Sequence, residues 1–488
     1  MSKEILSNAQ IIRIIEIIEG GLIPDAFTFQ NVNFWPHIRI SLIARLKKQH
    51  KETVKSSKLS LVSTQVIKTC KKIVQSFWYC NWLDRRSNLK KVQYTTMIVA
   101  PYVHRYGATK AGFLNQHADA LRNSSADSDS IGLIEYSFNF KQKKKRASDS
   151  KLLYLMPDLL GLKYQILSVL GIHKKNCSSK WLAAVDHINC VFAKENIAIY
   201  LNPQNLLLEV RRIEELASVF KKELLKHDVK HLINIVYCNF IAISFILAAR
   251  KLGIKTTEYQ HGSQDETHPH YSRWTLINDK GYELLPENYW VWSKNTFGYM
   301  SEWVDKTSFH NVRLTGNFYI SPYLSEVKKS HKKKVILLTL QEPSLFPNFM
   351  FEVIKQTSDE WEWWVREHPR FRMRASFWNK LVDLSNNHIV NVSDGHLYHL
   401  FPNVAVHMTG FSTCAFEAEL FDVPTIFFDK HAEFGYQSLI SKCKHLVYAS
   451  NFEQVLASID DILDIPITPS GFIEEAKHSV DYFLARLK

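Results

Sequence analysis

The stretch EYQHGSQDETHPHYS, Glu258–Ser272, concentrates side chains that can transfer protons or bind metal ions. It contains three histidines, His261, His268 and His270, and one glycine, Gly262. Zinc sites use His or Cys at short regular spacings such as HExxH or CxxC, and this stretch has neither. A histidine can instead act as a general base toward a hydroxyl group or hold a phosphate. We therefore predict a substrate loop without metal, turning at Gly262, with a purely structural His261 as the alternative.

Carboxylates near this loop are further candidates for the general base, because the base must lie within reach of the acceptor oxygen. The expected strands and helices bring three acids toward the same end of the sheet as His261: Asp119, Glu135 and Glu258. We do not rank these three acids against one another. The other polar positions of the loop are expected to bind the acceptor: Gln260, His268 and His270.

The motif TGFSTCAFEA, Thr409–Ala418, carries the strongest signal for an anionic ligand. A strand is expected to end at Gly410, and Ser412 and Thr413 are expected to open a helix. Backbone N–H groups at a helix start favour an anion by about 0.3–1 kcal/mol. Glu417 lies one turn further along and can accept from sugar hydroxyls, as acids do in dinucleotide sites. The motif predicts a phosphate site, with plain helix capping as the alternative.

Two shorter motifs are expected to meet the same donor. In REHP, Pro369 ends a tryptophan-rich strand and biases His368 toward an extended conformation, so that Arg366 and His368 can reach a nucleotide. In VRLTGNFY, the glycine lets the backbone approach a phosphate and the next residue adds an amide. A plain turn is the alternative for this second pair, Gly316 and Asn317.

These motifs must be positioned by two series of strands alternating with helices, the pattern of parallel sheets covered on both faces. The first series includes strands expected at 92–102, 131–138, 232–238, 254–260, 289–293 and 312–317. The second includes strands expected at 335–341, 361–369, 389–393, 404–410 and 423–429. The nearly uncharged run Leu232–Arg250 is interpreted as a strand and a helix and not as a membrane span. The loops at the carboxyl ends of the strands are expected to face a cleft between the two domains.

We expect four segments. They are a helical N-terminal segment at 1–90, an acceptor domain at 91–324, a nucleotide-sugar domain at 331–468 and a terminal helix at 469–488. The terminal helix would be capped by Ser470 and carry one apolar face: Phe472, Ala476, Val480, Phe483 and Leu487. In the N-terminal segment, Trp35 and Arg39 lie one turn apart, and a structural helix start is favoured over contact with a membrane-linked acceptor.

Composition restricts the partners. The formal charge of +13 and the pI of about 9.2 favour anionic partners such as phosphorylated metabolites or an anionic membrane face. The basic run KQKKKR, Lys141–Arg146, is expected to be an exposed loop or a membrane contact. Seven scattered cysteines without CxxC spacing suit a reducing cytoplasm. No helix-turn-helix, RRM or zinc-finger pattern supports nucleic-acid binding.

Together these residues resemble the bacterial surface-polysaccharide glycosyltransferases of the GT-B type, over roughly residues 92–440. The HP dipeptide followed by a Ser-Thr helix is similar to the sialyltransferase, polysialyltransferase and Kdo-transferase group. That resemblance implies that His368, Ser412 and Thr413 hold the CMP part of a donor, and that Gln260 and His261 lie near the sugar. It also implies an enzyme without bound metal or other cofactor. The (D/E)(D/E)G triplet of the sialyltransferases is absent, since SDG at Ser393–Gly395 lies in the wrong domain.

The sequence thus predicts an α/β protein of GT-B type, with two Rossmann-like domains facing a cleft and a helical N-terminal extension. The predicted function is a cytoplasmic glycosyltransferase that uses a nucleotide-sugar to build capsule or lipopolysaccharide O-antigen. The acceptor would be a saccharide or a lipid-linked molecule, with a possible peripheral membrane contact. One alternative is a CDP-polyol phosphotransferase of the teichoic-acid type. The other is a basic binding protein without enzymatic activity.

Overall fold

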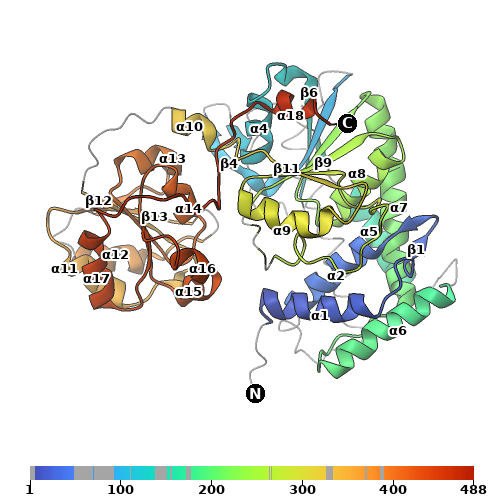
Figure 1. Ribbon diagram of the computed structural model, residues 1–488, viewed down its shortest axis with the longest axis horizontal. Helices are drawn as coiled ribbons and strands as arrows, with labels where there is room; N and C mark the ends of the chain where they lie inside the picture. Colours follow the sequence, from blue (N-terminus) through green and yellow to red (C-terminus); the bar gives the residue numbers. More distant parts are fainter. Residues whose placement is uncertain are drawn as a thin grey trace. The chain divides into compact units, whose positions relative to one another are not determined.

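The structure is a computed structural model that describes residues 6–48, 70, 93–109, 112–137, 151–153, 156–171, 177–262, 264, 266, 268–325, 334–368, 371–384 and 389–487. The chain forms two compact units (Figure 1). The first comprises Met1–Val291, Asn295–Thr315 and His478–Lys488, and the second comprises Trp292–Lys294 and Gly316–Lys477. The basic run 141–146 lies outside the described residues, as does nearly all of 49–92.

The first unit is built on a parallel sheet of seven strands in the order β11-β10-β9-β8-β3-β6-β7. The strands are β3 (Thr96–Pro101), β6 (Ile131–Tyr136), β7 (Lys151–Leu153), β8 (His231–Ile235), β9 (Lys255–Tyr259), β10 (Asn288–Val291) and β11 (Asn311–Leu314). The central strands β3 and β6 are buried along their whole length, because helices cover both faces of a parallel sheet. A small antiparallel pair, β4 (Arg105–Thr109) and β5 (Gly112–Asn115), follows β3.

The helices of this unit are α4 (Gln116–Asn123), α5 (Met156–Val169), α6 (Ser179–Lys194), α7 (Pro203–Lys226), α8 (Phe240–Arg250), α9 (Lys294–Val304) and α18 (Val480–Leu484). The run Leu232–Arg250 is a strand followed by a helix, as predicted. Asn239 caps α8 by accepting from two backbone N–H groups. Phe220 of α7 stacks on Phe245 of α8 with ring centroids 3.8 Å apart. Among the described residues, no helix is long and apolar enough to cross a membrane.

The N-terminal extension forms α1 (Asn8–Gly20) and α2 (Trp35–Lys48), joined through a short hairpin of β1 (Thr28–Phe29) and β2 (Val32–Asn33). A capping box starts α1: Ser7 accepts from the backbone of Gln10, and the Gln10 side chain accepts from the backbone of Ser7. Both helices bury isoleucines in the core of the first unit. The helical character predicted for this part is therefore confirmed for residues 8–20 and 35–48.

The second unit has a parallel sheet of six strands in the order β14-β13-β12-β15-β16-β17. The strands are β12 (Val335–Thr339), β13 (Glu362–Arg366), β14 (Ile389–Asn391), β15 (Val406–Thr409), β16 (Thr425–Phe427) and β17 (Leu446–Tyr448). Its helices are α10 (Ser321–Ser325), α11 (Phe349–Gln356), α12 (Ala375–Leu384), α13 (Leu397–Leu400), α14 (Cys414–Glu419), α15 (Lys430–Gly435), α16 (Gln437–Ile440) and α17 (Phe452–Asp461). The predicted two Rossmann-like α/β domains with a helical N-terminal extension are confirmed. The cleft between them stays a prediction.

The terminal helix expected over 469–488 is wrong in length, because α18 covers only Val480–Leu484 and is capped by Ser479. Ser470 does not cap a helix: its backbone and hydroxyl both donate to Glu419. Gly471 has a φ of +70°, which does not fit a right-handed helix. The sequence interpretation also missed β17 and α17.

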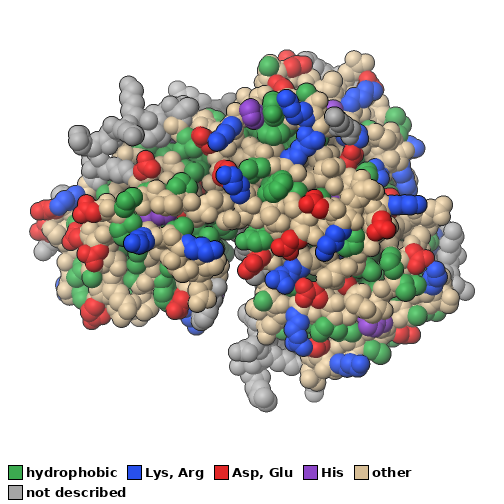
Figure 2. Space-filling view, in the orientation of Figure 1, with side chains coloured by type: hydrophobic (Ala, Val, Ile, Leu, Met, Phe, Trp, Pro, Cys, Tyr) green, Lys and Arg blue, Asp and Glu red, His purple; other side chains and the backbone are tan. Residues whose placement is uncertain are grey.

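Charged side chains of both signs are interspersed on the face of the molecule shown in Figure 2. The excess of lysine and arginine is not gathered into a single patch on that face. A basic composition therefore does not by itself mark a binding surface there.

Candidate functional site

The carboxyl end of the first sheet holds a group of histidines that comes from three separate segments. His261 follows β9, and its ring stacks on that of His104, with ring centroids 5.8 Å apart. His104 in turn lies 5.0 Å from His117 of α4. Because the carboxyl ends of parallel strands meet at one edge of the sheet, residues far apart in sequence converge there. The sequence analysis selected His261 and missed His104 and His117.

His261 is paired with a buried acid. Its Nδ1 lies 3.8 Å from Oε1 of Glu258, which also accepts a hydrogen bond of 2.9 Å from the hydroxyl of Tyr271. Burial, and to a smaller degree His268, lowers the pKa of His261 to about 3, so its imidazole is neutral at pH 7. Burial raises the pKa of Glu258 well above its usual range. The pair therefore has a neutral ring with Nδ1 toward the acid.

The two remaining histidines of the loop lie beside the same tyrosine. The ring of His268 is 4.9 Å from that of Tyr271 and 5.6 Å from that of His270. Burial lowers the pKa of His268 to about 4 and that of His270 well below its usual value. Gln260 is buried, and its amide donates to the carbonyl of Gly262, so it holds the turn. The loop is thus a neutral, partly buried set of imidazoles.

A buried ion pair from the N-terminal helices holds this loop, and the sequence analysis assigned it no role. The guanidinium of Arg39 on α2 donates 2.9 Å to Glu19 of α1, and both side chains are fully buried. Arg39 also donates to the carbonyl oxygens of Pro269 and Arg273. Glu19 accepts from the backbone of Thr275 at 2.9 Å. The prediction that Trp35 and Arg39 form a structural helix start is supported. Arg39 holds the loop that carries His261, His268 and His270, which is called the histidine loop below.

Two of the acids proposed as bases are engaged in structural contacts. Both oxygens of Glu135 accept from Arg105, and Oε1 also accepts from Asn115 at 2.9 Å. Asp119 accepts a hydrogen bond of 2.6 Å from the backbone of Asn115 at the start of α4 and lies 3.8 Å from Arg122. These contacts position the segment that carries His117. We therefore do not assign either acid a role in proton transfer.

The second sheet also gathers polar residues at its carboxyl end. Gln341, after β12, accepts a hydrogen bond of 2.8 Å from the backbone of Phe411, after β15. A Cβ at Gly410 would lie 2.6 Å from Oε1 of Gln341. Gly410 is therefore required for this close approach between two loops. Gly410 thus serves packing within the second unit. The motif alone did not reveal its contact with Gln341.

The predicted phosphate helix is shorter and weaker than expected. Helix α14 has six residues, and Ser412 accepts from the backbone of Cys414 at 3.3 Å, whereas Thr413 makes no capping bond. Burial raises the pKa of Glu417 to about 7, although Tyr398 and the charge of Arg366 oppose the shift. A short helix contributes a small dipole. An anion at this edge would therefore depend mainly on the guanidinium of Arg366.

Arg366, at the end of β13, has polar and aromatic residues around it. It donates to the carbonyl of Gly395 at 3.3 Å, and its buried Nε makes no hydrogen bond. Close by, His396 shares a short hydrogen bond of 2.5 Å with the hydroxyl of Tyr319 and stacks on Tyr323. Burial lowers the pKa of His396 to about 4. His396 was not selected from the sequence, because the motif HLYHL has no recognisable spacing.

His368 is partly exposed, and its ring lies 5.1 Å from that of Phe371. The preceding acid fixes the loop. Glu367 is buried, and it accepts from Arg372 at 2.7 Å, from the backbone of Met373 and from Trp378. Burial alone would raise the pKa of Glu367, but these hydrogen bonds hold it below its usual value. The loop after β13 is therefore ordered around Glu367, with His368 at its surface.

Gly316 and Asn317 form a turn that contacts the backbone at Glu474 and Glu475. Gly316 has a φ of +76°, and a Cβ there would lie 2.1 Å from the carbonyl oxygen of Glu475. The backbone of Asn317 donates 2.7 Å to Glu474, and its side chain accepts from the backbone of Tyr319. The alternative of a plain turn describes this pair better than donor binding.

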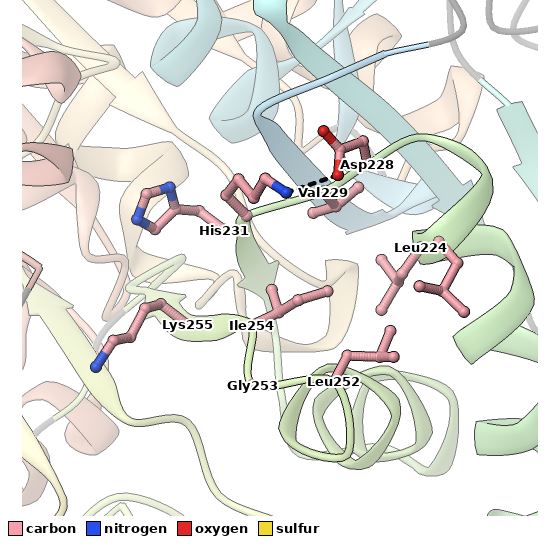
Figure 3. Close-up of a pocket in the computed structure, with 10 residues that line it drawn as sticks. Leu224, Asp228, Val229, His231, Leu252, Gly253, Ile254 and Lys255 are labelled. Carbon is pink, nitrogen blue, oxygen red and sulfur yellow. Dashed lines mark hydrogen bonds and ion pairs between the residues drawn. The ribbon is translucent and has the colours of Figure 1, made fainter.

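A cavity of about 370 Å³ lies at the opposite, amino end of the first sheet, beside the starts of β8 and β9 (Figure 3). Leu224, Leu252 and Ile254 form an apolar wall, whereas His231 and Lys255 point to the other side. No candidate residue lines it. Among the described residues, no group of three or more His, Cys, Asp or Glu could hold a metal ion.

No protein-family model matches the sequence, and no curated protein matches it. Among solved structures, the chain is similar to a UDP-GlcNAc 2-epimerase from Methanocaldococcus jannaschii, with 13% identity and a TM-score of 0.46 over 80% of this chain and 99% of that one. It is also similar to MurG from Acinetobacter baumannii, with 9% identity and a TM-score of 0.43 over 80% and 98%. The wall teichoic acid polymerase TagF matches with 9% identity and a TM-score of 0.38 over 88% and 94%.

Proposed function

We propose that the protein is a glycosyltransferase that moves a sugar from a nucleotide-activated donor to a hydroxyl of a saccharide or lipid-linked acceptor. The observation that carries this proposal is the pair of His261 and Glu258 at the carboxyl end of a parallel sheet. A neutral imidazole has a lone pair that can take a proton from a hydroxyl group, although a pKa of about 3 makes it a weak base. The polymer we propose is capsule or lipopolysaccharide O-antigen, made at the cytoplasmic side of the membrane.

In the proposed reaction, Nε2 of His261 removes the proton of the acceptor hydroxyl. The acceptor oxygen forms a bond to the anomeric carbon of the donor sugar, and the bond from that carbon to the phosphate oxygen breaks. The leaving phosphate keeps the bonding electrons. The proton stays on the imidazole, whose Nδ1 lies 3.8 Å from Oε1 of Glu258. General-base assistance of this kind typically contributes about 10²- to 10⁴-fold.

In this proposal, the second unit binds the nucleotide-sugar donor. Arg366 offers a guanidinium whose buried Nε has no hydrogen-bond partner, and guanidinium groups bind phosphate with charge-assisted hydrogen bonds. Ser412 and Thr413 are proposed to supply hydroxyls to the same donor, and Glu417, with a pKa of about 7, can accept from a ribose or sugar hydroxyl. His368 is proposed to contact the nucleotide from the loop after β13. A CMP-linked sugar is favoured among donors.

The test is a panel of nucleotide-sugars and one CDP-polyol, measured for binding by calorimetry and for transfer by product analysis. We expect one nucleotide-sugar to bind, and Arg366→Ala to weaken it by about tenfold or more, as expected for a hydrogen bond to a charged group. Arg374→Ala, at an exposed arginine of the same unit, is the control and should bind normally. Transfer of a polyol phosphate would replace the proposed reaction, and absence of any nucleotide binding would contradict it.

A further inference from the structure

We infer that a cavity among α2, α5 and α7 binds the phosphate ester of the acceptor, a site separate from the histidine loop. The cavity has a volume of about 500 Å³ and lies wholly within the first unit. Phe240, at the start of α8 just beyond the carboxyl end of β8, forms part of its wall. The inference rests on the proposed function, because it assigns the acceptor's charged group to this cavity.

Basic groups in the cavity are only partly paired. Arg212 of α7 donates 2.8 Å to the carbonyl of Pro157 and lies 3.9 Å from the ring centroid of Phe240. Its Nε is buried and makes no hydrogen bond. His37 of α2 is buried, and its Nε2 lies 3.5 Å from the carboxylate of Glu209. Buried donors without partners are costly unless a ligand satisfies them.

The acidic groups around the cavity do not cancel the positive charge of these basic groups. Glu209 is the acid that lines it, and it is engaged by Arg45 at 2.7 Å and by Ser41 at 3.3 Å. The negative charge of Asp158 acts to raise the pKa of Arg212, as does that of Glu209. Asp158 does not line the cavity. The start of α7, a helix of 24 residues capped by Asn202, also lies at the cavity. Its positive end adds to the guanidinium in favouring an anion.

The rest of the lining suits a hydroxylated molecule. Polar side chains of α5 and α7 surround the charged groups, and Ser168 donates 2.8 Å to Asn205, which ties the two helices together. Tyr200, which is 75% exposed, and Tyr164 supply aromatic faces at the cavity. Aromatic rings and amides are typical partners of sugars and polyols, and arginine is the typical partner of phosphate. The ligand class is therefore a phosphate ester of a sugar or polyol.

Such an ester can come from a soluble sugar phosphate or from a lipid headgroup. Leu159, Ile166 and Leu170 are between 42% and 62% exposed, and their spacing places them on one side of α5 or just beyond its end. They lie on the side of α5 opposite Gly161, Tyr164 and Ser168, which line the cavity, so they do not favour either source. Both sources carry a phosphate ester, and the experiment below distinguishes a soluble sugar phosphate from a lipid headgroup.

The experiment uses the full chain without any donor. Calorimetry with glucose 1-phosphate, inorganic phosphate and glucose is followed by sedimentation with vesicles of phosphatidylglycerol or phosphatidylcholine. We expect a phosphate-containing probe to bind and glucose not to bind. Arg212→Gln should weaken binding about tenfold, whereas Lys222→Gln, an exposed position on the same helix, should leave it unchanged.

A second variant protects the test against misfolding. A Cβ at Gly161 would lie 2.9 Å from the guanidinium of Arg212, so Gly161→Ala displaces that group while favouring the helix. It should also weaken binding. Binding of glucose 1-phosphate alone assigns a soluble source, and binding of phosphatidylglycerol vesicles that glucose 1-phosphate competes for assigns a lipid headgroup. No binding of any phosphate probe, or equal binding by all variants, overturns the inference. Donor binding and transfer, measured separately, would then still test the proposed function.

Discussion

The carboxyl ends of the two sheets carry different kinds of chemistry. In the first unit the polar groups are mostly imidazoles that burial keeps neutral, with His261 next to Glu258. In the second unit the groups are a guanidinium, Arg366, and a carboxyl with a pKa of about 7, Glu417. Neutral imidazoles suit proton transfer, and charged groups suit the binding of phosphate. The same sheet architecture can thus support two different tasks through its loops alone.

The largest expected effect tests whether proton transfer belongs to the first unit alone. His261→Ala should lower the rate of transfer by about 10²- to 10⁴-fold, because the general base is lost. Nucleotide binding should remain unchanged in calorimetry. His231→Ala, at the amino end of the same sheet, is the control and should transfer normally. Equal loss of transfer and nucleotide binding in His261→Ala would show that the two tasks are not divided as we propose.

The second prediction concerns the support of the histidine loop. Arg39→Met leaves Glu19 as an unpaired buried charge, which typically costs about 3–5 kcal/mol of the free energy of unfolding. Denaturant unfolding should show this loss, and transfer should fall with it. Arg13→Met removes a pair on the surface of α1, with 65% of the arginine exposed, and should change stability little. Similar stability of both variants would mean that the loop does not depend on Arg39.

The smallest expected effect is a difference in acid sensitivity between the units. At the edge of the first unit, burial holds the pKa of His117 and His261 at about 3 and that of His268 at about 4. The unfolded chain protonates these histidines below about pH 6.5, so stability falls as the pH falls from there. Glu258, whose pKa is raised, acts in the opposite direction and offsets part of the loss. Each buried histidine whose effect is not offset lowers the free energy of unfolding by up to about 1.4 kcal/mol for each unit by which the pH falls.

In the second unit, the buried groups that lose stability on acidification and those that gain it are more nearly equal. His396, with a pKa of about 4, loses stability on acidification, whereas Glu417, with a pKa of about 7, gains it. His407, buried between Thr339 and Thr425, adds to the loss. Hydrogen exchange at pH 7 and pH 5.5 should therefore show protection falling first in the first unit. Earlier loss in the second unit would contradict this assignment of buried neutral histidines.

The sequence predicted the strands well because a strand buried on both faces is a short, continuous apolar run. It predicted the terminal helix wrongly because local spacing was overridden: the bonds of Ser470 to Glu419 and the positive φ of Gly471 leave 470–479 outside a helix. Asp119 and Glu135 were ranked with His261 because their partners Asn115 and Arg105 cannot be inferred from spacing. His104, His117 and His396 were missed, and the partners of Arg39 were not foreseen, since these contacts join residues that lie far apart along the chain.

The return of residues 478–488 to the first unit has a consequence for biosynthesis. Asp481 of α18 accepts from the hydroxyl of Ser125 and the backbone of Ala126, and the ring of Phe483 lies 5.7 Å from that of Trp290. The ribosome makes these residues only after the whole second unit. The first unit therefore completes its structure last although its synthesis begins first. Until then Trp290 on β10 lacks its contact with Phe483, and a nascent chain stalled after residue 477 would expose this part of the sheet to chaperones.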